Sequence, residues 1–265
     1  MKFSIVANTK QENIREILKK VIGFVEDFEL DKVTADFLGL NGVEIKDLSG
    51  DVIISLGGDG TILHILSQIN KPILGINFGG VGFLNELEPE SDILTAIDNV
   101  THKKYFEEKL HRIDTYLNDL NVGTAVNEIV LHTSRVAKIQ GFEISTNGKL
   151  IDSFRGDGVI IATPTGSTSY SMSIGAPIIY PTMESNLIVP MAPYKLGSRP
   201  LILPANYDIS AKIKGHPEAV MVIDGKEEIF IKGDDKIEFK ASNNPATLIR
   251  FSKNFFDRLR NKLRL

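Results

Sequence analysis

Residues 51–61 read DVIISLGGDGT, and they indicate the architecture of the first part of the chain. The β-branched run from Asp51 to Leu56 is typical of a buried strand, and two glycines end it. Residues 61–69 carry the apolar spacing of a helix, so strand, turn and helix follow one another directly. This order predicts one unit of an open α/β sheet, with a glycine turn at the carboxyl end of the strand.

The same alternation extends over the first hundred residues. Strand-like runs at 3–7 and 72–77 alternate with helix-like stretches at 11–28 and from Ser91 onward. Strands separated by helices require right-handed crossovers, which give a parallel sheet with helices on both faces. We therefore predict an α/β domain over residues 1–100.

A different pattern begins near Thr101. Beyond it the apolar runs are short and β-branched, and turns separate them about every 8 to 12 residues, as in all-β proteins. Asn147-Gly148 and Asp224-Gly225 each stand between two strand-like runs, which is a good hairpin signal. We therefore predict a β-rich domain over residues 101–251. The amphipathic stretch 252–265 is predicted to be a closing helix that packs on the first domain; a helix lying on a membrane is the alternative.

The composition excludes several classes of protein. The chain has 265 residues, a formal net charge of −4 and no cysteine. Without cysteine there can be no disulfide framework, zinc–thiolate site, iron–sulfur cluster or cysteine nucleophile. The slightly acidic balance argues against nucleic acid as a partner, and no apolar run suits a signal peptide or a membrane span. We expect a cytoplasmic protein that binds neither nucleic acid nor membrane.

The glycine turn carries the first candidate for chemistry. Gly57, Gly58 and Gly60 let a phosphate approach backbone N–H groups, and the next helix points its positive end at the same place. Asp59 stands in the middle of this turn, where a negative charge disfavours phosphate. Its presence makes sense if it accepts a proton or binds hydroxyl groups. The alternative is that Asp59 only caps the helix and the glycines only serve the turn.

Two further polar segments accompany the turn. Residues 77–84 read NFGGVGFL and form a second glycine-rich loop behind the next predicted strand. Asn127 and Glu128 interrupt an apolar run, so they lie either at an exposed strand end or bulge, or in a buried hydrogen-bonding site. A buried carboxylate is costly without a partner, and a ligand hydroxyl or an amide would supply one.

The longest informative stretch reads RGDGVIIATPTGSTSYS over residues 155–171. It combines an acidic glycine turn, a buried strand and a loop dense in hydroxyl groups. Such a loop offers many donors and acceptors, and Tyr170 adds a ring for stacking or a phenolic hydroxyl. A solvated linker is the alternative, but the apolar run at 174–180 argues against it.

Together these segments resemble one family, the NAD kinases, which phosphorylate the adenosine-ribose 2′-hydroxyl of NAD. The family's marks are a GGDGT turn, a glycine-rich loop ending in GFL, an NE pair and an RGDG…TPTGST segment, and all four occur in this order over residues 51–203. The resemblance implies a two-domain NAD kinase architecture. GGDG alone also marks lipid kinases and phosphofructokinases, so a lipid or polyol kinase is the alternative. A third possibility is a dinucleotide-binding regulator without activity.

Other sequence features bear on these alternatives. Lipid kinases usually carry an Asn-Glu pair shortly after the turn, where this chain has Ile62-Leu63-His64. No Walker sequence and no G-x-G-x-x-G fingerprint occur, which disfavours a P-loop kinase and a Rossmann dehydrogenase.

The resemblance implies roles for the glycine turn. Asp59 would accept the proton of the attacking 2′-hydroxyl, and Gly57, Gly58 and Gly60 would shape the turn that faces the phosphates. The phosphate donor would be ATP or inorganic polyphosphate. Mg²⁺ or another divalent cation would come with the donor rather than sit in a cage of protein ligands, and the five histidines show no metal-ligand spacing.

The resemblance also implies how NAD is held. Asn127 and Glu128 would contact ribose hydroxyls and the base, and Asp157, with Arg155 nearby, would read the nicotinamide end. In this family the latter contact can come from a neighbouring subunit, so we expect a homodimer or homotetramer. The other expected NAD contacts come from the hydroxyl-rich loop on the adenine side, from a backbone contact to adenine, and from two lysines. They are Thr168, Ser169, Tyr170, Ser171, Met172, Ser173, Ala192, Lys138 and Lys226.

Overall fold

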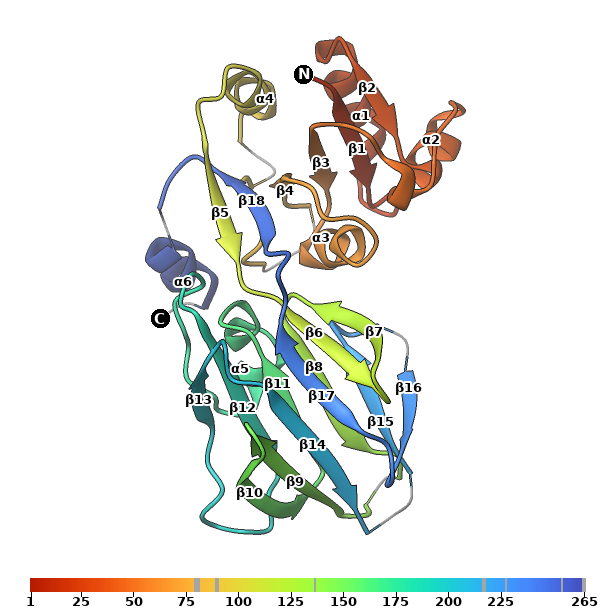
Figure 1. The fold of residues 1–265 in the computed structure, drawn as a ribbon. Coiled ribbons are helices and arrows are strands. Elements are labelled where there is room, and N and C mark those ends of the chain that lie inside the picture. Colours follow the sequence, from red (N-terminus) through yellow and green to blue (C-terminus); the bar gives the residue numbers. More distant parts are fainter. Residues whose placement is uncertain are drawn as a thin grey trace. The chain divides into compact units, whose positions relative to one another are not determined.

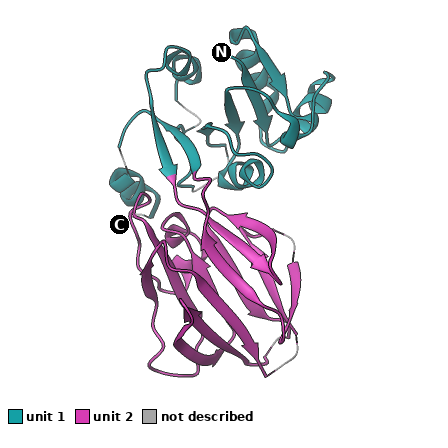
Figure 2. Ribbon diagram, viewed as in Figure 1, with its two compact units in different colours: residues 1–109, 246–265 teal, residues 110–245 magenta. Residues whose placement is uncertain are grey.

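The chain forms two compact units, Met1–Lys109 with Ala246–Leu265, and Leu110–Pro245 (Figure 2). Each unit has a buried apolar core of its own. The computed structural model describes residues 1–78, 82–88, 91–135, 137–215, 218–226, 228–253 and 255–263.

A six-stranded sheet forms the core of the first unit (Figure 1). Its strand order is β2-β1-β3-β4-β18-β5, and the pairs β1–β2, β1–β3, β3–β4 and β4–β18 are parallel. Strands β1, β3 and β4 are buried along their whole length, which explains their continuous apolar runs. The strand bounds are β1 (Phe3–Ala7), β2 (Phe28–Leu30), β3 (Val52–Leu56), β4 (Ile73–Ile76), β5 (Phe106–Leu110) and β18 (Ala246–Arg250).

The helices of the first unit follow from this strand order. Helix α1 (Ile14–Phe24) leads from β1 outward to β2, whereas α2 (Lys32–Leu38) leads back past β1 to β3. Right-handed crossovers place these two helices on opposite faces of the sheet. The direction therefore reverses between β1 and β3, and in such sheets ligands bind beyond the carboxyl ends of the strands at the reversal. The other helices are η1 (Ile45–Asp47), α3 (Asp59–Leu66), α4 (Ile93–Thr101) and α6 (Phe255–Leu263).

The second unit consists of two six-stranded sheets whose inner faces share one buried cluster. Their strand orders are β10-β9-β14-β17-β6-β7 and β13-β12-β11-β8-β15-β16, and every recorded pair is antiparallel. In this cluster, Phe142 of β9 and Phe239 of β17, from the first of these two sheets, pack with Leu131 of β8 and Ile161 of β11, from the other. The strands are β6 (Ile113–Leu117), β7 (Leu120–Ala125), β8 (Glu128–Thr133), β9 (Gln140–Thr146), β10 (Lys149–Gly156), β11 (Gly158–Ala162), β12 (Ser185–Met191), β13 (Leu201–Pro204), β14 (Ile209–Lys214), β15 (Glu218–Ile223), β16 (Glu228–Lys232) and β17 (Ile237–Ala241), with short helices η2 (Thr165–Thr168) and α5 (Tyr170–Ser173).

Both predicted hairpin turns have the expected backbone. Asn147 and Gly148 have φ values of 48° and 74°, and Asp224 and Gly225 have 48° and 67°. Two successive residues with positive φ are what a type I′ turn requires. The predicted fold class, an α/β domain with a parallel sheet followed by a β-rich domain, is confirmed.

The unit boundaries differ from the predicted ranges in one respect. Strands β5 and β18 belong to the sheet of the first unit, although both fall within the range 101–251 assigned to the β-rich domain. The reason is that β18 pairs in parallel with β4, a partner far away in sequence. Helix α6 also lies in the first unit. In the described part of the chain, no helix has the length and apolar character needed to cross a bilayer.

Candidate active site

Asp59 is the first residue of α3, which begins where the glycine turn leaves β3. Its carboxylate accepts hydrogen bonds from the backbone N–H groups of Phe83 (2.6 Å) and Leu84 (3.1 Å) and from the side-chain amide of Asn85 (2.9 Å). The side chain does not cap α3, so the capping alternative is wrong. An ionised carboxylate can accept about four hydrogen bonds, so three donors fix its orientation and leave capacity for one more.

Two glycines allow this close packing. A Cβ on Gly82 would overlap the Asp59 carboxylate, and a Cβ on Gly57 would overlap the Thr61 hydroxyl. A Cβ on Gly60, in contrast, would meet no protein atom within 4 Å. Packing within the unit therefore explains the first two glycines but not the third. The remaining glycines of the predicted second loop, at 79 and 80, lie outside the described residues.

Arg250 of β18 supports the segment that binds Asp59. Its guanidinium donates to the carbonyl oxygens of Leu84 (2.9 Å) and Asn85 (3.1 Å). The same buried group is paired with Glu108 at 2.7 Å and with Glu86 at 3.3 Å. Because a buried charge is costly unless it is paired, these two carboxylates make the buried arginine tolerable.

Helix α6 adds two more cationic side chains to the same segment. Arg258 donates to the carbonyl oxygen of Asn85 at 3.1 Å, and Lys262 hydrogen-bonds to the carbonyl oxygen of Gly82. Lys262 also forms an ion pair with Glu88 at 3.2 Å. The backbone that orients the Asp59 carboxylate is thus held from behind by the last strand and the last helix.

In the second unit, Asn127 lies between β7 and β8, and Glu128 is the first residue of β8. They are buried, with 9% and 6% of their surface exposed, so the pair forms a buried hydrogen-bonding site rather than an exposed strand end. The backbone N–H groups of Val126, Asn127 and Glu128 all donate to the carboxylate of Asp224, at 2.8, 2.8 and 3.0 Å. The Asp224 carboxylate therefore fixes the backbone between β7 and the start of β8, from which the side chains of Asn127 and Glu128 project.

The carboxylate of Glu128 is only partly satisfied. Oε1 accepts a hydrogen bond from the Ser169 hydroxyl at 3.1 Å, whereas Oε2 has no hydrogen-bond partner among the described residues. Burial, followed by the nearby Asp224, raises the pKa of Glu128 to about 7, although Ser169 and the backbone of Tyr170 act in the opposite direction. A buried carboxylate with an open acceptor is more typical of a binding site than of core packing.

Asp224 and Lys226 lie beside this pair. Burial raises the pKa of Asp224 even though three backbone N–H groups and Lys226 favour its charged form. Burial lowers the pKa of Lys226, and Asp224 partly offsets that effect. The predicted contact Lys226 is thus placed in the same cluster as Asn127 and Glu128.

The hydroxyl-rich loop folds against the Asn-Glu pair, so it is not a solvated linker. Gly166 packs so closely on Asn127 that a Cβ would overlap the Asn127 carbonyl group. The hydroxyl groups of Thr165 and Ser171 are buried and make no hydrogen bond to the described residues. Tyr170 is exposed, with 43% of its surface open. The other predicted loop residues, Thr168, Ser169, Met172 and Ser173, lie in or beside η2 and α5.

The remaining predicted contacts lie at the opposite end of the same strands. Glu128 pairs with Ala162 at the end of β11, whereas Asp157 directly precedes the first residue of that strand. Five residues of strand separate the two ends by about 16 Å. Ala192 directly follows β12 and lies beside Asp157. The backbone N–H of Asp157 donates to the carbonyl oxygen of Met191, the last residue of β12, at 3.0 Å. Lys138 and the exposed Arg155 are at this end too, since Gln140 pairs with Gly156.

Two contributors could not be found from the sequence. In the sequence, Asp224 indicates only a hairpin turn. Its contact with Val126 could not be predicted because the two residues are 98 positions apart. Asn85 follows the glycine-rich loop directly, but nothing in its local pattern indicates that its amide binds Asp59. Asp31, which caps α2 in the structure, belongs to no motif that would single it out in the sequence.

The first unit has a carboxylate-bearing glycine turn at the switch point of an α/β sheet, the second unit has a half-satisfied polar site, and the chain matches a class of two-domain kinases without a P-loop. Residues 9–105 match the family model described as the ATP-NAD kinase N-terminal domain, and residues 126–251 match the ATP-NAD kinase C-terminal domain. The chain belongs to the NAD kinase family.

Individual relatives agree with this assignment. The NAD kinase of Methanosarcina mazei is 40% identical over 257 residues, which cover 94% of this chain and 88% of the relative. The NAD kinase of Methanothermobacter thermautotrophicus is 40% identical over 275 residues, covering 99% and 96%.

Two solved structures resemble the fold over nearly its whole length. The crystal structure of an NAD kinase from Archaeoglobus fulgidus in complex with ATP has a TM-score of 0.82 at 28% identity, covering 100% of this chain and 99% of that one. Yeast NADH kinase complexed with NADH has a TM-score of 0.89 at 25% identity, covering 99% and 87%.

Proposed function

We infer that this protein is an NAD kinase, which transfers the terminal phosphoryl group of ATP, or of polyphosphate, to the adenosine-ribose 2′-hydroxyl of NAD. Family membership supports the activity. The observation that carries the chemical assignment is the Asp59 carboxylate, which three donors orient and which retains capacity for one more hydrogen bond.

We propose that Asp59 acts as the general base. As the 2′-oxygen forms its bond to the terminal phosphorus, the bond from that phosphorus to the leaving oxygen breaks, and the hydroxyl proton passes to the Asp59 carboxylate. General-base assistance of this kind contributes roughly 10² to 10⁴-fold to the rate. Fixed orientation of the carboxylate supports this role, because proton transfer requires the acceptor to lie within hydrogen-bonding reach of the hydroxyl.

The glycines of the turn fit a phosphate-binding role. Gly58 caps α3 without a side-chain hydrogen bond, so the N–H groups of the first helical turn can face an anion. The open space beside Gly60 allows a phosphate to approach the backbone. We propose that Mg²⁺ arrives with the donor phosphates, whose charge it neutralises. The donor phosphates would supply the ligands of this cation, and the remaining acceptor site of Asp59 would stay with the ribose hydroxyl.

For the dinucleotide, we propose that the half-satisfied site of the second unit holds the adenosine of NAD. Glu128 Oε2 and the hydroxyl groups of Thr165 and Ser171 have no hydrogen-bond partner among the described residues, and the amino and hydroxyl groups of adenosine would supply partners. Asn127, Ser169 and Lys226 stand beside these groups, and the exposed ring of Tyr170 offers a face for stacking. Thr168, Met172 and Ser173 stay predicted contacts of the same loop.

Four of the predicted NAD contacts lie at the end of the β-strands opposite to Glu128. Asp157 lies about 16 Å from Glu128 along β11, and Arg155, Ala192 and Lys138 lie at the same end as Asp157. We propose that a neighbouring subunit supplies Asp157, with Arg155 nearby, to the nicotinamide end, in keeping with the family resemblance. This requires a homodimer or homotetramer, which size-exclusion chromatography with light scattering would test. Ala192 stays a predicted backbone contact to adenine, and Lys138 stays a predicted contact to NAD. The cytoplasmic location stays a prediction.

A coupled assay tests the activity itself. The purified protein is incubated with ATP, Mg²⁺ and NAD, and any NADP is detected by its reduction with an NADP-specific dehydrogenase. NADP formation is expected. The absence of NADP with ATP and also with polyphosphate would contradict the proposal, and NAD binding by calorimetry without turnover would indicate a regulator instead.

A further inference from the structure

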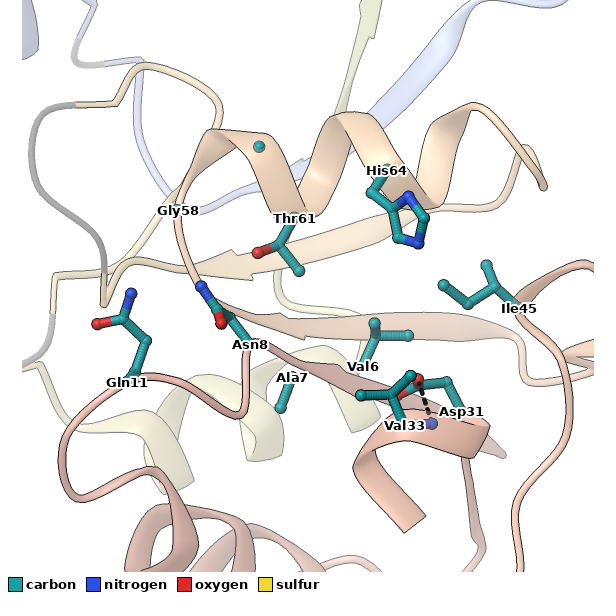
Figure 3. A pocket seen from close by; sticks show the side chains of 11 residues that line it. Val6, Ala7, Asn8, Gln11, Asp31, Val33, Ile45, Gly58, Thr61 and His64 are labelled. Carbon is teal, nitrogen blue, oxygen red and sulfur yellow. Dashed lines mark hydrogen bonds between the residues drawn. The ribbon is translucent and has the colours of Figure 1, made fainter. Parts of the chain in front are cut away.

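A cavity of about 400 Å³ lies in the first unit where the strand order reverses between β1 and β3 (Figure 3). This volume is within the range of small-molecule pockets. Its walls come from the carboxyl end of β1, the start of α2, and the first turns of α3. The lining side chains are apolar on one part of the wall and polar on the rest: Val6, Ala7, Val33 and Ile45, with Asn8, Gln11, Asp31, Thr61 and His64. The proposed NAD contacts include none of them.

Asp31 is the buried acid of this cavity. It follows β2 directly, and only 3% of its surface is exposed. Oδ2 caps α2 by accepting hydrogen bonds from the N–H groups of Val33 (3.0 Å) and Thr34 (3.4 Å), the first of which is drawn in Figure 3. Oδ1 has no hydrogen-bond partner among the described residues. Because an unpaired buried acceptor is destabilising, a donor from a ligand is the natural partner for Oδ1.

The position of Asp31 in the fold indicates which donor that is. In the dinucleotide-binding sheets of Rossmann type, which share this reversal of strand order, an acidic residue about 20 residues beyond the first βα turn hydrogen-bonds a ribose hydroxyl, and Asp31 has the analogous place although this chain lacks their glycine fingerprint. Asp31 follows β2, the strand next to β1, and the first βα turn begins at Asn8. A ribose hydroxyl would therefore meet Oδ1.

The rest of the cavity suits the other parts of a nucleotide. The exposed N-terminus of α3 at Gly58 and Gly60 can face phosphates. Val33 is 61% exposed although apolar, and it lines the cavity together with the ring of His64. An apolar side chain and an imidazole ring offer surfaces on which a planar base can pack.

We propose that this cavity binds the nucleoside of the phosphate donor, with Asp31 Oδ1 accepting a hydrogen bond from a ribose hydroxyl and the phosphates lying over Gly58 and Gly60. The proposal rests on the kinase function inferred above. It selects a nucleoside triphosphate as the donor, because polyphosphate has neither a base to fill the cavity nor a hydroxyl for Asp31.

The variant Asp31→Asn tests the proposal. Asparagine keeps one oxygen to cap α2 but replaces the open acceptor with an amide donor. Asp92→Asn is the matched control, since Asp92 caps α4 in the same way, through the N–H of Thr95 at 3.1 Å, and does not line the cavity. For Asp31→Asn we expect the KM for ATP to rise about 10- to 100-fold with the KM for NAD unchanged. A folded Asp31→Asn protein with the KM of the wild type for ATP would overturn the proposal.

Donor analogues give a second readout on the unmodified protein. The loss of one ribose hydroxyl, in 2′-deoxyATP or 3′-deoxyATP, should raise the KM by a similar factor in the wild type and have little effect in Asp31→Asn. Equal KM values of the wild type for ATP and both analogues would contradict the assignment. So would tripolyphosphate that matches ATP in kcat/KM.

Calorimetry separates this proposal from the activity. Binding of a non-hydrolysable ATP analogue with Mg²⁺ is measured without NAD. Binding that weakens in Asp31→Asn and not in Asp92→Asn supports the pocket even if no NADP forms. Equal binding by wild type and Asp31→Asn overturns the pocket even if NADP does form.

Discussion

The carboxylates of Asp59 and Glu128 differ in how fully their oxygens are hydrogen-bonded. Asp59 accepts three hydrogen bonds that fix its orientation, whereas Glu128 is buried with one oxygen lacking a partner among the described residues. The first arrangement suits a group that must meet a substrate hydroxyl in one geometry. The second costs stability in the free protein, and a bound ligand can recover that cost by donating to the open oxygen.

The raised pKa of Glu128 predicts a pH-dependent stability effect. Its pKa is about 7 in the folded protein against an ordinary value of 4.5, so folding favours the protonated form. The contribution to stability is therefore fully present below about pH 4.5 and is lost as the pH rises through about 7. Glutamine cannot ionise. At pH 8 and without NAD, the free energy of unfolding of Glu128→Gln should therefore be about 1–3 kcal/mol higher than that of the wild type, so the variant is the more stable protein.

Denaturant titrations at pH 8 and pH 4.5 measure this effect. The difference between Glu128→Gln and the wild type should vanish at the lower pH. A difference of the same size at both pH values would show that the carboxylate is not held in the unfavourable environment described here.

Gly60 gives a second prediction at this scale. A Cβ there meets no protein atom within 4 Å, and alanine favours a helix over glycine by up to about 1 kcal/mol. Gly60→Ala should therefore be at least as stable as the wild type but have a raised KM for ATP, because the methyl group enters the proposed phosphate site.

Gly23→Ala is the control for Gly60→Ala. Gly23 lies in α1, and its Cβ would likewise meet nothing within 4 Å. Thermal unfolding and steady-state kinetics should show similar stability for both variants but an altered KM for ATP in Gly60→Ala alone. Unchanged donor kinetics in Gly60→Ala would contradict phosphate binding at the turn.

Among the elements, α6 has a role that its position at the end of the chain does not suggest. Lys262 and Arg258 hold the carbonyl oxygens of Gly82 and Asn85, and the neighbouring N–H groups orient Asp59. Lys262→Met should therefore lower kcat about tenfold while the KM for ATP changes little, since the mutation loosens the segment that positions the base.

Arg260→Met is the matched control on the same helix. Arg260 is exposed and pairs with Asp257 at 2.6 Å rather than with the 82–85 segment. Steady-state kinetics should show wild-type kcat for Arg260→Met. Equal effects of the two substitutions, or none, would show that α6 does not position Asp59.

The elements also show how far sequence reasoning extends. The run 51–61 predicted β3, its turn and α3, because burial, glycine and helical spacing are local properties. The Asn-Glu pair was predicted as a possible buried site, and Gly166 explains physically why it lies against the hydroxyl-rich loop. The sheet to which β18 belongs could not be predicted, because its periodicity does not identify a partner strand. The open oxygen of Asp31 was hidden for the same reason, since its surroundings come from three separate segments.

At the scale of the whole molecule, Glu128 and Asp157 lie at opposite ends of the paired strands β8 and β11, and this separation predicts that two subunits share one site. If a neighbouring subunit supplies Asp157, then Asp59→Asn and Asp157→Ala subunits should complement each other when they are unfolded and reassembled together. In a dimer mixed at random, half of the molecules are hybrids with one intact site each, so activity should recover to about a quarter of the wild-type value. A mixture of Asp59→Asn with Asp59→Ala serves as the control and should stay inactive. Hybrids that form but show no activity would contradict a shared site.

NADP formation by the wild type and by Asp59→Asn, measured at saturating ATP, Mg²⁺ and NAD, tests whether the Asp59 carboxylate is the general base of an NAD kinase. An NAD kinase with Asp59 as its general base should form NADP, and a folded Asp59→Asn protein that still binds NAD should have a kcat at least about 10²-fold lower. No NADP from the wild type with any phosphate donor, or turnover by Asp59→Asn near the wild-type rate, would contradict this assignment.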